Sequence, residues 1–464
     1  MSILNEQVTN NNHIVEMDIY STLFKSILFP GYERIKGRRT SSLLTEAEDR
    51  LQWPLEKIEQ YQLTSLRNLL HYCDQHVPYY QRQWKALDFN PKDLTSVAQL
   101  AQLPPLTKQD IQENYDLLVP QEKRASNYKK STGGSTGRPF HFELDKGSYE
   151  TRQAMMWRGY GWGGVTIGTR TWYLWGVELG SQSWKAKFKD DLFHRFYHRK
   201  MANSFALSKD NFHQYIEEIN DYRPKAIVAY VAPLYSLAKY INERGIQLHQ
   251  PQVILTGAEA LLEYQRQEIQ KAFRCQVLNT YGCREFMLIG AECPQQNGLH
   301  LNIDQLVVET IDEQRQTVKN QVGDILITDL FNYGMPLVRY VNGDQGVISE
   351  RRCECHNPLP MLESVNGRKL DIIRSPEGRI LPGEFFPHLL KDFRGIERFQ
   401  VRQKSLSSLD IFIVANEQYD SATQATINGH IQQAMGNQLD VVFHQVSDIP
   451  LTSTGKHRVT ISEL

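Results

Sequence analysis

The sequence predicts an α/β protein with a large N-terminal domain of parallel strands and helices, followed by a small C-terminal α+β domain. Residues 226–279 alternate short apolar runs with helical patterns, which is typical of parallel strands joined by right-handed crossovers. The chain has 464 residues, which is enough for two or three domains. After residue 366 the pattern changes, and a stretch of about 100 residues can form its own small domain. We therefore expect domains at 1–366 and 367–464.

The two ends of the chain have different patterns. Residues 1–90 are expected to be mainly helical, and apolar residues recur at helical spacing in 55–77, which predicts an amphipathic helix. The C-terminal domain is expected to have strands at 409–415 and 441–444. A helix is expected between these strands, at 421–435.

The central region predicts the position of a binding site. Three short apolar runs, at 226–231, 253–255 and 275–278, are the expected strands. Helical patterns at 234–243 and 261–273 separate them. Ligands bind beyond the carboxyl ends of strands in such sheets, so the segments that follow the second and third strands should face one crevice.

Composition excludes several classes of protein. Lys and Arg number 52 against 53 Asp and Glu, and this balance argues against a nucleic-acid partner. No run approaches about 18 apolar residues, so no membrane span is expected. The N-terminus lacks a basic start followed by an apolar run, which favours the cytoplasm over secretion. Six cysteines are too few for a disulfide scaffold, so clustered cysteines are better interpreted as metal ligands.

A Ser/Gly-rich stretch at 131–139 is the strongest local signal. Its glycines let the backbone approach an anion, and its N–H groups and hydroxyls can donate hydrogen bonds to one. Lys129 and Lys130 precede the stretch and can offset phosphate charge. A flexible Ser/Gly turn is the alternative, and the stretch lacks the Gly-Lys-Ser/Thr ending of a Walker loop. The candidate binding residues are Ser131, Thr132, Gly133, Gly134, Ser135, Thr136, Gly137 and Arg138.

Five further motifs follow in the order found in acyl-adenylate-forming enzymes. Together with the loop they resemble the phenylacetate–CoA ligase-like branch of that superfamily, close to its capsular polysaccharide-associated members. The resemblance covers residues 131–456, most of the chain. The motifs are Thr256-Gly257-Ala258-Glu259, Tyr281-Gly282-Cys283-Arg284-Glu285, Arg339-Tyr340-Val341-Asn342-Gly343-Asp344, Gly367-Arg368 and Thr452-Ser453-Thr454-Gly455-Lys456.

The resemblance implies a large adenylate-forming domain, a mobile C-terminal domain and a role for each motif. The loop at 131–138 would hold the phosphates of ATP, and Lys456 would be the catalytic lysine. Glu285 would hold Mg²⁺ and assist catalysis, and Asp344 would bind the ribose hydroxyls. The resemblance also implies nucleotide binding by Gly257, Ala258, Glu259, Tyr281 and Gly282. It implies that Arg368 lies at the start of the hinge and contributes to cofactor binding.

The chemistry of adenylation suits these residue types. A carboxylate must attack the α-phosphate of ATP, so two anions have to meet in a fixed geometry. Lys456 can bridge them as a point charge, and Glu285 is a hard oxygen ligand of the kind Mg²⁺ prefers. Each residue alone also has an ordinary explanation. Lys456 would be a solvated lysine of the C-terminal tail, Glu285 a charge at the start of a helix, and Asp344 a turn residue.

The hinge departs from the family pattern. Leu370 stands where the family has a charged residue, and Asp371 follows it. This departure leaves open the details of the hinge and of the second half-reaction, in which the acyl group is transferred to its acceptor, but it does not affect the adenylation. The acyl pocket is also poorly specified, with the aromatic-rich segments 172–178 and 230–235 as candidate walls.

A second constellation predicts a structural Zn²⁺ site. Cys293 and His300 follow the Glu285 motif, and Cys353 and Cys355 follow Asp344. Three cysteines and one histidine form a known closed zinc set. The spacing is not that of a standard finger, so four unrelated residues are the alternative, and His356 could replace His300.

The sequence therefore predicts a cytoplasmic ligase that uses ATP and Mg²⁺ to activate a small carboxylic acid as acyl-AMP. The acyl group would pass to a thiol, with CoA as the expected acceptor. One alternative keeps the adenylation but transfers the acyl group to an amine, such as an amino sugar in surface polysaccharide biosynthesis. Another is a nucleotide-binding protein without catalysis. The family often forms dimers, so the resemblance implies a homodimer.

Overall fold

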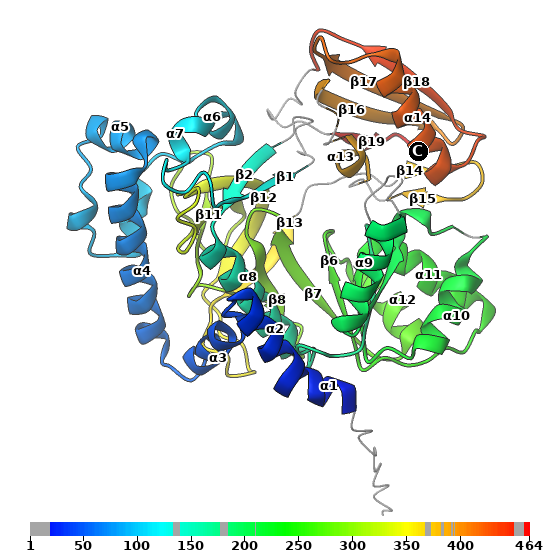
Figure 1. The fold of residues 1–464 in the computed structure, drawn as a ribbon, viewed down its shortest axis with the longest axis horizontal. Helices are drawn as coiled ribbons and strands as arrows, with labels where there is room; N and C mark the ends of the chain where they lie inside the picture. The colour runs from blue at the N-terminus through cyan, green and yellow to red at the C-terminus, as the bar shows by residue number, and fades with distance from the viewer. Residues whose placement is uncertain are drawn as a thin grey trace, which may run out of the picture.

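The structure is a computed structural model of the 464-residue chain. It describes residues 19–132, 140–176, 184–208, 210–366, 373–381, 385–390, 393, 395–449 and 459–464. Figure 1 shows a broad, curved sheet flanked by helices, and a separate group of C-terminal strands above it. The predicted α/β fold class is confirmed.

The largest sheet of the described residues has eleven strands. They are β3 (Thr171–Trp175), β4 (Arg199–Asn203), β5 (Ala226–Tyr230), β6 (Val253–Gly257), β7 (Gln276–Cys283), β8 (Met287–Glu292), β9 (Leu299–Leu301), β10 (Leu306–Ile311), β11 (Gly323–Asp329), β12 (Tyr340–Ser349) and β13 (Met361–Asn366). Their spatial order is β10-β11-β12-β13-β9-β8-β7-β6-β5-β3-β4. In this spatial order, neighbouring strands from β7 through β6, β5 and β3 to β4 pair in parallel. Neighbouring strands from β10 through β11, β12, β13, β9 and β8 to β7 pair antiparallel.

The predicted β-α-β-α-β unit is confirmed at residues 226–283. Strands β5, β6 and β7 lie side by side and parallel, joined by α11 (Val231–Arg244) and α12 (Glu263–Phe273). Helix α11 starts before the predicted position and ends at Gly245, whose φ of 60° is the left-handed conformation that glycine adopts at no steric cost.

Strand β7 is longer than the sequence predicts. Its first part pairs in parallel with β6 up to Asn279, and its second part pairs antiparallel with β8 from Thr280. The segment after Leu278 therefore continues as a strand and connects the two halves of the sheet. As a result, Tyr281, Gly282 and Cys283 lie in the strand and Arg284 and Glu285 lie in the turn into β8, where the sequence predicted a segment beyond the end of a shorter strand.

The predicted helical character of the N-terminal part is confirmed for residues 19–90. Its helices, and those that follow as far as the first hairpin, are α1 (Ile19–Leu23), the π-helical turn η1 (Phe24–Leu28), α2 (Phe29–Lys36), α3 (Thr40–Arg50), α4 (Leu55–His76), α5 (Pro78–Ala86), the 3₁₀ turns η2 (Pro91–Asp93) and η3 (Val97–Gln102), α6 (Lys108–Glu113) and α7 (Tyr115–Leu118). The predicted amphipathic helix is α4.

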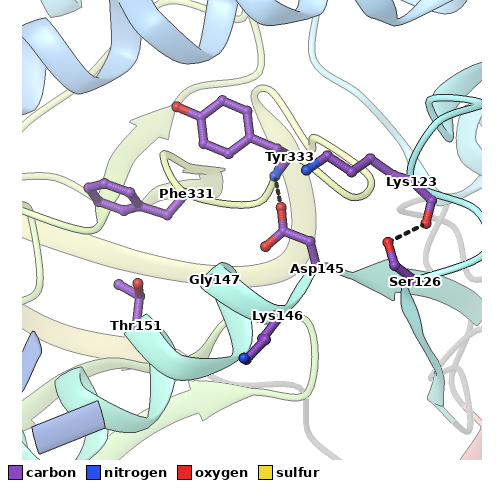
Figure 2. Close-up of a pocket in the computed structure, with 8 residues that line it drawn as sticks. All are labelled: Lys123, Ser126, Asp145, Lys146, Gly147, Thr151, Phe331 and Tyr333. Atoms are coloured by element: carbon purple, nitrogen blue, oxygen red, sulfur yellow. Dashed lines mark hydrogen bonds between the residues drawn. The ribbon is translucent and has the colours of Figure 1, made fainter. Parts of the chain in front are cut away.

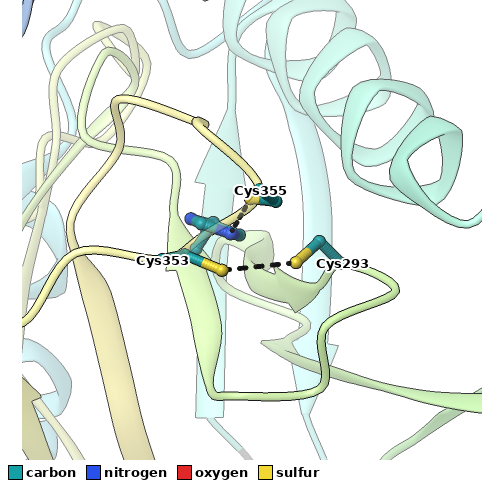
Figure 3. Close-up of side chains that lie close together, drawn as sticks. Cys293, Cys353 and Cys355 are labelled. Atoms are coloured by element: carbon teal, nitrogen blue, oxygen red, sulfur yellow. Dashed lines mark hydrogen bonds between the residues drawn. The ribbon is translucent and has the colours of Figure 1, made fainter.

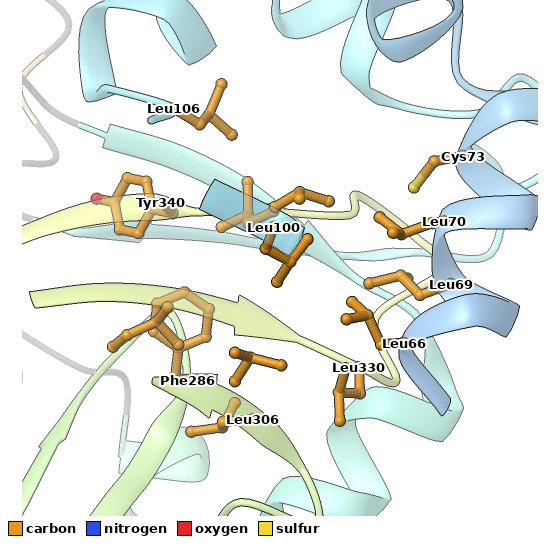
Figure 4. Packing of buried hydrophobic residues seen from close by; sticks show 14 of the residues in the cluster. Leu66, Leu69, Leu70, Cys73, Leu100, Leu106, Phe286, Leu306, Leu330 and Tyr340 are labelled. Carbon is orange, nitrogen blue, oxygen red and sulfur yellow. The ribbon is translucent and has the colours of Figure 1, made fainter. Parts of the chain in front are cut away.

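Helix α4 packs its apolar stripe onto the antiparallel half of the sheet. Figure 4 shows Leu66, Leu69 and Leu70 of α4 facing a cluster that includes Phe286 and Tyr340 near the candidate site. All five side chains are fully buried. Complete burial of one such apolar side chain stabilises the fold by about 1.5–3 kcal/mol, so α4 anchors the sheet edge behind the site.

The remaining helices and hairpin of the large domain flank the parallel strands and the sheet junction. They are the hairpin β1 (Tyr128–Thr132) and β2 (Phe140–Leu144), the helices α8 (Lys146–Trp162), α9 (Trp184–Phe196) and α10 (Phe212–Tyr222), and the 3₁₀ turn η4 (Ser204–Ala206). No helix among the described residues is long and apolar enough to cross a membrane.

The C-terminal part forms its own four-stranded sheet. The elements are β14 (Ile373–Arg374), β15 (Ile380–Leu381), α13 (Phe385–Leu390), β16 (Ile396–Ser405), β17 (Ser408–Ala415), α14 (Ser421–Met435), β18 (Asp440–Gln445) and β19 (Thr460–Ser462). The order is β18-β17-β16-β19, which confirms the predicted strands at 409–415 and 441–444 and the helix at 421–435. Phe385 of this part meets Phe205 of the large domain edge to face, with ring centroids 5.2 Å apart.

Candidate active site

A cavity of about 1440 Å³ lies at the junction of the two halves of the sheet. It is lined by the ends of β6 and β7, the turn into β8, and the middle of β12. Seven of the predicted site residues line it: Gly257, Ala258, Glu259, Tyr281, Gly282, Glu285 and Asp344. Three motifs that are far apart in the sequence therefore meet in one cavity.

The other predicted residues of the nucleotide and catalytic motifs are only partly described. Ser131 and Thr132 are the last residues of β1. The Arg284 guanidinium donates a 3.0 Å hydrogen bond to the carbonyl oxygen of Ser131, so the loop begins beside the Glu285 motif. Gly133, Gly134, Ser135, Thr136, Gly137, Arg138, Arg368 and Lys456 lie outside the described residues.

Close backbone packing explains two of the glycines. A Cβ atom at Gly282 would lie 1.9 Å from the carbonyl oxygen of Met287, so only glycine fits the bulged turn that precedes Glu285. A Cβ atom at Gly257 would lie 2.9 Å from Oγ1 of Thr280 on the neighbouring strand. These glycines let β6, β7 and β8 approach closely at the cavity floor.

The segment after β6 has an unusual backbone. Ala258 has a φ of 68°, a conformation that non-glycine residues rarely adopt and that is often retained at functional sites. The Glu259 carboxylate accepts a 2.7 Å hydrogen bond from the backbone N–H of Ala232 in the first turn of α11. Glu259 thus ties this segment to α11 and shapes the cavity wall.

A hydrogen-bonded group surrounds Asp344. The Tyr281 hydroxyl donates to Oδ2 of Asp344 at 2.9 Å, and the Asn342 amide donates to the same oxygen at 3.0 Å. The Asn342 amide also donates to the Tyr281 hydroxyl at 2.6 Å. Burial, and then the negative charge of Asp344, raise the pKa of Tyr281 well above its ordinary value, so the phenol stays a donor. The network holds the carboxylate in one orientation.

Glu285 is a carboxylate at the cavity wall that is only 5% exposed. The Tyr340 hydroxyl donates to its Oε1 at 3.2 Å. The neighbouring Cys283 is half-buried, and burial together with the charge of Glu285 raises its thiol pKa well above the ordinary value. A hard oxygen ligand facing a cavity that also holds Asp344 suits Mg²⁺, which proteins bind through one or two carboxylates plus substrate phosphates.

Basic side chains line the same cavity. Lys108, Lys130 and Arg284 are among them. Burial, and then the nearby charge of Arg284, lower the pKa of Lys130. Cations concentrated near the start of the 131–139 loop would attract a polyanionic substrate.

Aromatic residues form a wall at the parallel end of the cavity. Tyr173, Trp175 and Tyr230 line it, and the rings of Trp175 and Tyr230 lie 4.3 Å apart between centroids. Of the candidate wall segments, Trp172 instead packs in the core behind the sheet. Tyr235 is partly buried against the same core.

Four predicted metal ligands lie together behind the cavity. The ligand atoms of Cys293, His300, Cys353 and Cys355 all lie within 4.8 Å of one another. Figure 3 shows the three sulfur atoms pointing toward a common centre, and the Sγ atoms of Cys293 and Cys353 are 3.6 Å apart. A tetrahedral zinc with Zn–S bonds of about 2.3 Å would place sulfurs roughly 3.8 Å apart, so the spacing fits such an ion.

The histidine of this group is held in position for a metal. Nδ1 of His300 lies 3.3 Å from the carbonyl oxygen of Leu359, and its Nε2 lies 3.2 Å from Sγ of Cys355. A carbonyl at one ring nitrogen favours the tautomer whose other nitrogen can bind a cation. Burial raises the pKa of the Cys293 thiol to about 12, and a bound cation would favour the thiolate instead.

A smaller cavity of about 360 Å³ lies at the start of α8 and contains none of the predicted site residues. Figure 2 shows Asp145 pointing at the backbone of Tyr333, whose N–H donates to Oδ2 at 3.2 Å. Asp145 also accepts from the backbone N–H of Ser148 at 2.8 Å and so caps the helix. These contacts give Asp145 a structural role.

The sequence interpretation assigned no role to Tyr340 or Asn342. Both lie in the quoted Arg339–Asp344 motif, but an aromatic residue and an amide inside a strand give no signal of their own. Their contacts with Glu285 and Tyr281 become visible only in the folded chain.

The comparisons with known proteins agree with this fold. Residues 373–463 match the family model described as the CapK C-terminal domain. Protein CapK of Staphylococcus aureus is 24% identical over 93% of this chain and 92% of its own. A phenylacetate–coenzyme A ligase of Pseudomonas putida is 24% identical over 77% of this chain and 82% of its own.

A solved structure shares the fold over most of the chain. A 2-hydroxyisobutyryl-CoA ligase, crystallised with 2-HIB-AMP and CoA, superposes with a TM-score of 0.61 at 20% identity, over 89% of this chain and 92% of its own. The sequence relatives and the matched family model confirm the predicted resemblance. The chain is therefore similar in sequence to CapK and to the phenylacetate–coenzyme A ligases, and it shares the fold of a 2-hydroxyisobutyryl-CoA ligase.

Proposed function

We propose that this protein activates a carboxylic acid with ATP and transfers the acyl group to a thiol, with CoA as the acceptor. The observation that carries the proposal is the meeting of Tyr281, Glu285 and Asp344 in one cavity, next to the strand that leads into the 131–139 loop. The relatives named phenylacetate–coenzyme A ligase support the same reaction class.

In the first half-reaction, a carboxylate oxygen of the acid attacks the α-phosphorus of ATP, and the bond to the bridging oxygen of pyrophosphate breaks. Asp344 would accept hydrogen bonds from the ribose hydroxyls and thereby fix the nucleoside. Glu285 would hold Mg²⁺, which when bound offsets the negative charge of the phosphate oxygens. Lys456 would lie between the two reacting anions and stabilise their approach.

In the second half-reaction, the acceptor sulfur attacks the acyl carbonyl carbon and AMP leaves with the electrons of the broken bond. We propose that the C-terminal domain, with its boundary at residue 367, turns between the two half-reactions. Such a turn would deliver Lys456 for the first step and withdraw it for the second.

An amine acceptor is the second candidate. The match to CapK extends over 93% of this chain, against 77% for the ligase of Pseudomonas putida, and the CapK family model covers residues 373–463. If the C-terminal domain shapes the acceptor side, an amine such as an amino sugar is the second acceptor to test beside CoA.

We also propose that Cys293, His300, Cys353 and Cys355 hold a structural zinc ion. The site would join the loop after β8, the strand that follows the Glu285 turn, to the segment between β13 and β12, the strand that carries Asp344. With four protein ligands, its role would be to hold these strands together.

The test is exchange of labelled pyrophosphate into ATP with a panel of aromatic, aliphatic and hydroxylated acids. Exchange that depends on one class of acid supports adenylation. Release of AMP with CoA, but not with amines, then assigns the thiol acceptor, and the reverse assigns the amine. Tight ATP binding without exchange for any acid would favour a binding protein without catalysis.

A further inference from the structure

The N-terminal helix has an exposed apolar ridge that the proposed reaction does not use. Elements α1, η1 and α2 form one continuous helix over residues 19–36, because Leu23, Leu28 and Phe29 all keep right-handed helical dihedral angles at the junctions. At 1.5 Å per residue this helix is about 27 Å long. Figure 1 shows it at the lower edge of the molecule, away from the C-terminal strands.

The ridge consists of Ile19, Leu23, Ile27 and Ile35. Their side chains are 79%, 41%, 62% and 83% exposed, respectively. The first three recur every fourth residue, and Ile35 lies two such steps after Ile27. Residues four positions apart in an α-helix are slightly rotated relative to each other around the helix axis. The wider π turn at Phe24–Leu28 reverses part of this rotation. The four side chains therefore lie along one side of the helix.

The opposite side of the helix is firmly packed. Phe24 and Phe29 are buried, and the Phe24 ring meets the Phe196 ring with centroids 5.0 Å apart. The Tyr20 hydroxyl donates to the carbonyl oxygen of Phe196 at 2.9 Å, and the Ser21 hydroxyl donates to that of Gly168 at 2.7 Å. These contacts hold the helix in place and keep the ridge outward.

The exposed charged side chains of this helix are positive. Lys25, Arg34 and Lys36 are exposed, and the structure records no ion pair of theirs with another described residue. Glu33 is the only acidic residue within 19–36 of the sequence. It is 5% exposed, and its carboxylate accepts from the backbone N–H of Ser41 at 3.1 Å, so it faces away from the ridge.

We propose that this helix binds to the surface of an anionic lipid bilayer, with the ridge in the boundary between headgroups and acyl chains. A helix with an apolar face and flanking lysines and arginines lies in the plane of such a surface. Each cation near an anionic surface adds to the attraction. A symmetric contact with a second copy fits less well, because it would bring positive charges of both copies into one interface.

The experiment is flotation of the full chain with vesicles. One set contains equal parts of phosphatidylglycerol and phosphatidylcholine, and the other contains phosphatidylcholine alone. The tested variant carries Ile19→Glu and Ile27→Glu. The matched control carries Leu87→Glu and Val322→Glu, two apolar side chains that are 48% and 51% exposed elsewhere on the surface. A third variant replaces Lys25, Arg34 and Lys36 by glutamine.

We expect the wild-type chain and the matched control to float with the anionic vesicles and to remain unbound with phosphatidylcholine alone. The ridge variant should bind at least about tenfold more weakly, because two charges would replace aliphatic groups in the bilayer boundary. The glutamine variant should bind more weakly too, and high salt should weaken the wild type similarly.

Equal binding of the ridge variant and the wild type would overturn the proposal, as would failure of the wild type to float with anionic vesicles. A wild-type dimer in light scattering that becomes a monomer in the ridge variant, without vesicle binding by either, would assign the ridge to a second copy. Thermal unfolding checks that the variants are folded. If the double variant unfolds, the single substitution Ile35→Glu, at the most exposed ridge residue, replaces it.

Discussion

At the residue scale, the proposed reaction depends on a few charged groups that face one cavity. Glu285 and Asp344 supply carboxylates on neighbouring walls, and Lys130 and Arg284 supply positive charge near the start of the phosphate loop. Both signs of charge suit the proposed reaction, in which the cavity would admit a metal-bound triphosphate together with a carboxylate.

Lys456→Ala is expected to lower acid-dependent pyrophosphate exchange by about two to three orders of magnitude, while ATP affinity stays close to that of the wild type. The reason is that the lysine would act on the transition state, where the two anions meet, more than on bound ATP. Exchange rates and ATP titration measure the two effects separately. Lys456→Arg is the control, because it keeps the charge but loses the compact ammonium geometry. Normal exchange by Lys456→Ala would contradict the assignment.

Glu285→Gln keeps the size of the side chain and removes its charge. Loss of a metal-binding carboxylate should lower exchange about a hundredfold and raise the Mg²⁺ concentration needed for half-maximal rate. The measurement is a Mg²⁺ titration of exchange at saturating ATP. The control Glu263→Gln changes an exposed carboxylate on α12 and should leave the titration unchanged. An unchanged midpoint in Glu285→Gln would show that Mg²⁺ is held elsewhere.

At the element scale, the junction strand β7 is the feature that builds the site. Because it pairs in parallel with β6 and antiparallel with β8, it brings the segment after β6 and the Glu285 turn to the same cavity. Gly282 allows the close approach of β8 that this arrangement needs. The substitution of this glycine therefore tests the element directly.

Gly282→Ala is expected to reduce the free energy of unfolding by about 1–3 kcal/mol, because the added methyl group collides with the backbone of the facing strand. Chemical denaturation measures the loss. The matched control is Gly161→Ala in helix α8, where an added Cβ meets no atom within 4 Å. That control should be neutral or more stable by about 0.5–1 kcal/mol. Equal stability of Gly282→Ala and the wild type would contradict the close approach of β7 and β8 at this junction.

Zinc is expected at about one equivalent per chain in metal analysis of the purified protein. Removal with a strong chelator should lower the melting temperature, since the ion would join segments that meet only in the folded state. Cys353→Ser should lose the metal and show the same lower melting temperature without chelator. Cys73→Ser, which changes a buried cysteine of α4, is the control for a lost thiol and should retain the metal. Absence of metal from the wild type would reject the zinc site.

The sequence predicts the local elements well and the long-range pairings poorly. Strands β5, β6 and the start of β7, with the helices between them, have strong apolar periodicity and are confirmed. The antiparallel half from β8 to β13 is not evident from the sequence, because its pairings join residues far apart in the chain. Tyr340 belongs to this half, so its contact with Glu285 could not be predicted.

The candidate site was predictable as motifs, and the shared crevice of the segments near residues 257 and 281 was predictable too, but its side-chain contacts were not. The motif order predicted the residues of the site, and the structure shows that Gly257, Tyr281, Glu285 and Asp344 line one cavity. The same holds for the four candidate zinc ligands. Their residue types indicated a metal site, but only the folded chain shows that Cys293 lies close to Cys353. The roles of Lys456 and the 131–139 loop stay predictions.

At the scale of the whole molecule, the proposal requires two domains that move relative to each other. The four-stranded C-terminal sheet is separate from the eleven-stranded sheet, and Phe385 contacts Phe205 across them. If residues 367–372 act as the hinge, limited trypsin digestion should cut there first. A stable acyl-AMP analogue with the matching acid should slow this cleavage several-fold by holding one arrangement. First cleavage at another site, unaffected by the analogue, would contradict the hinge.

The most direct test of the central claim is a crystal structure of the protein with ATP and Mg²⁺. We predict one nucleotide in the large cavity, with its ribose hydroxyls on Asp344, its base beside Tyr281 and its phosphates at the 131–139 loop. A nucleotide bound elsewhere, or one in the cavity that touches neither Asp344 nor the loop, would contradict the claim that these distant motifs form a single adenylation site.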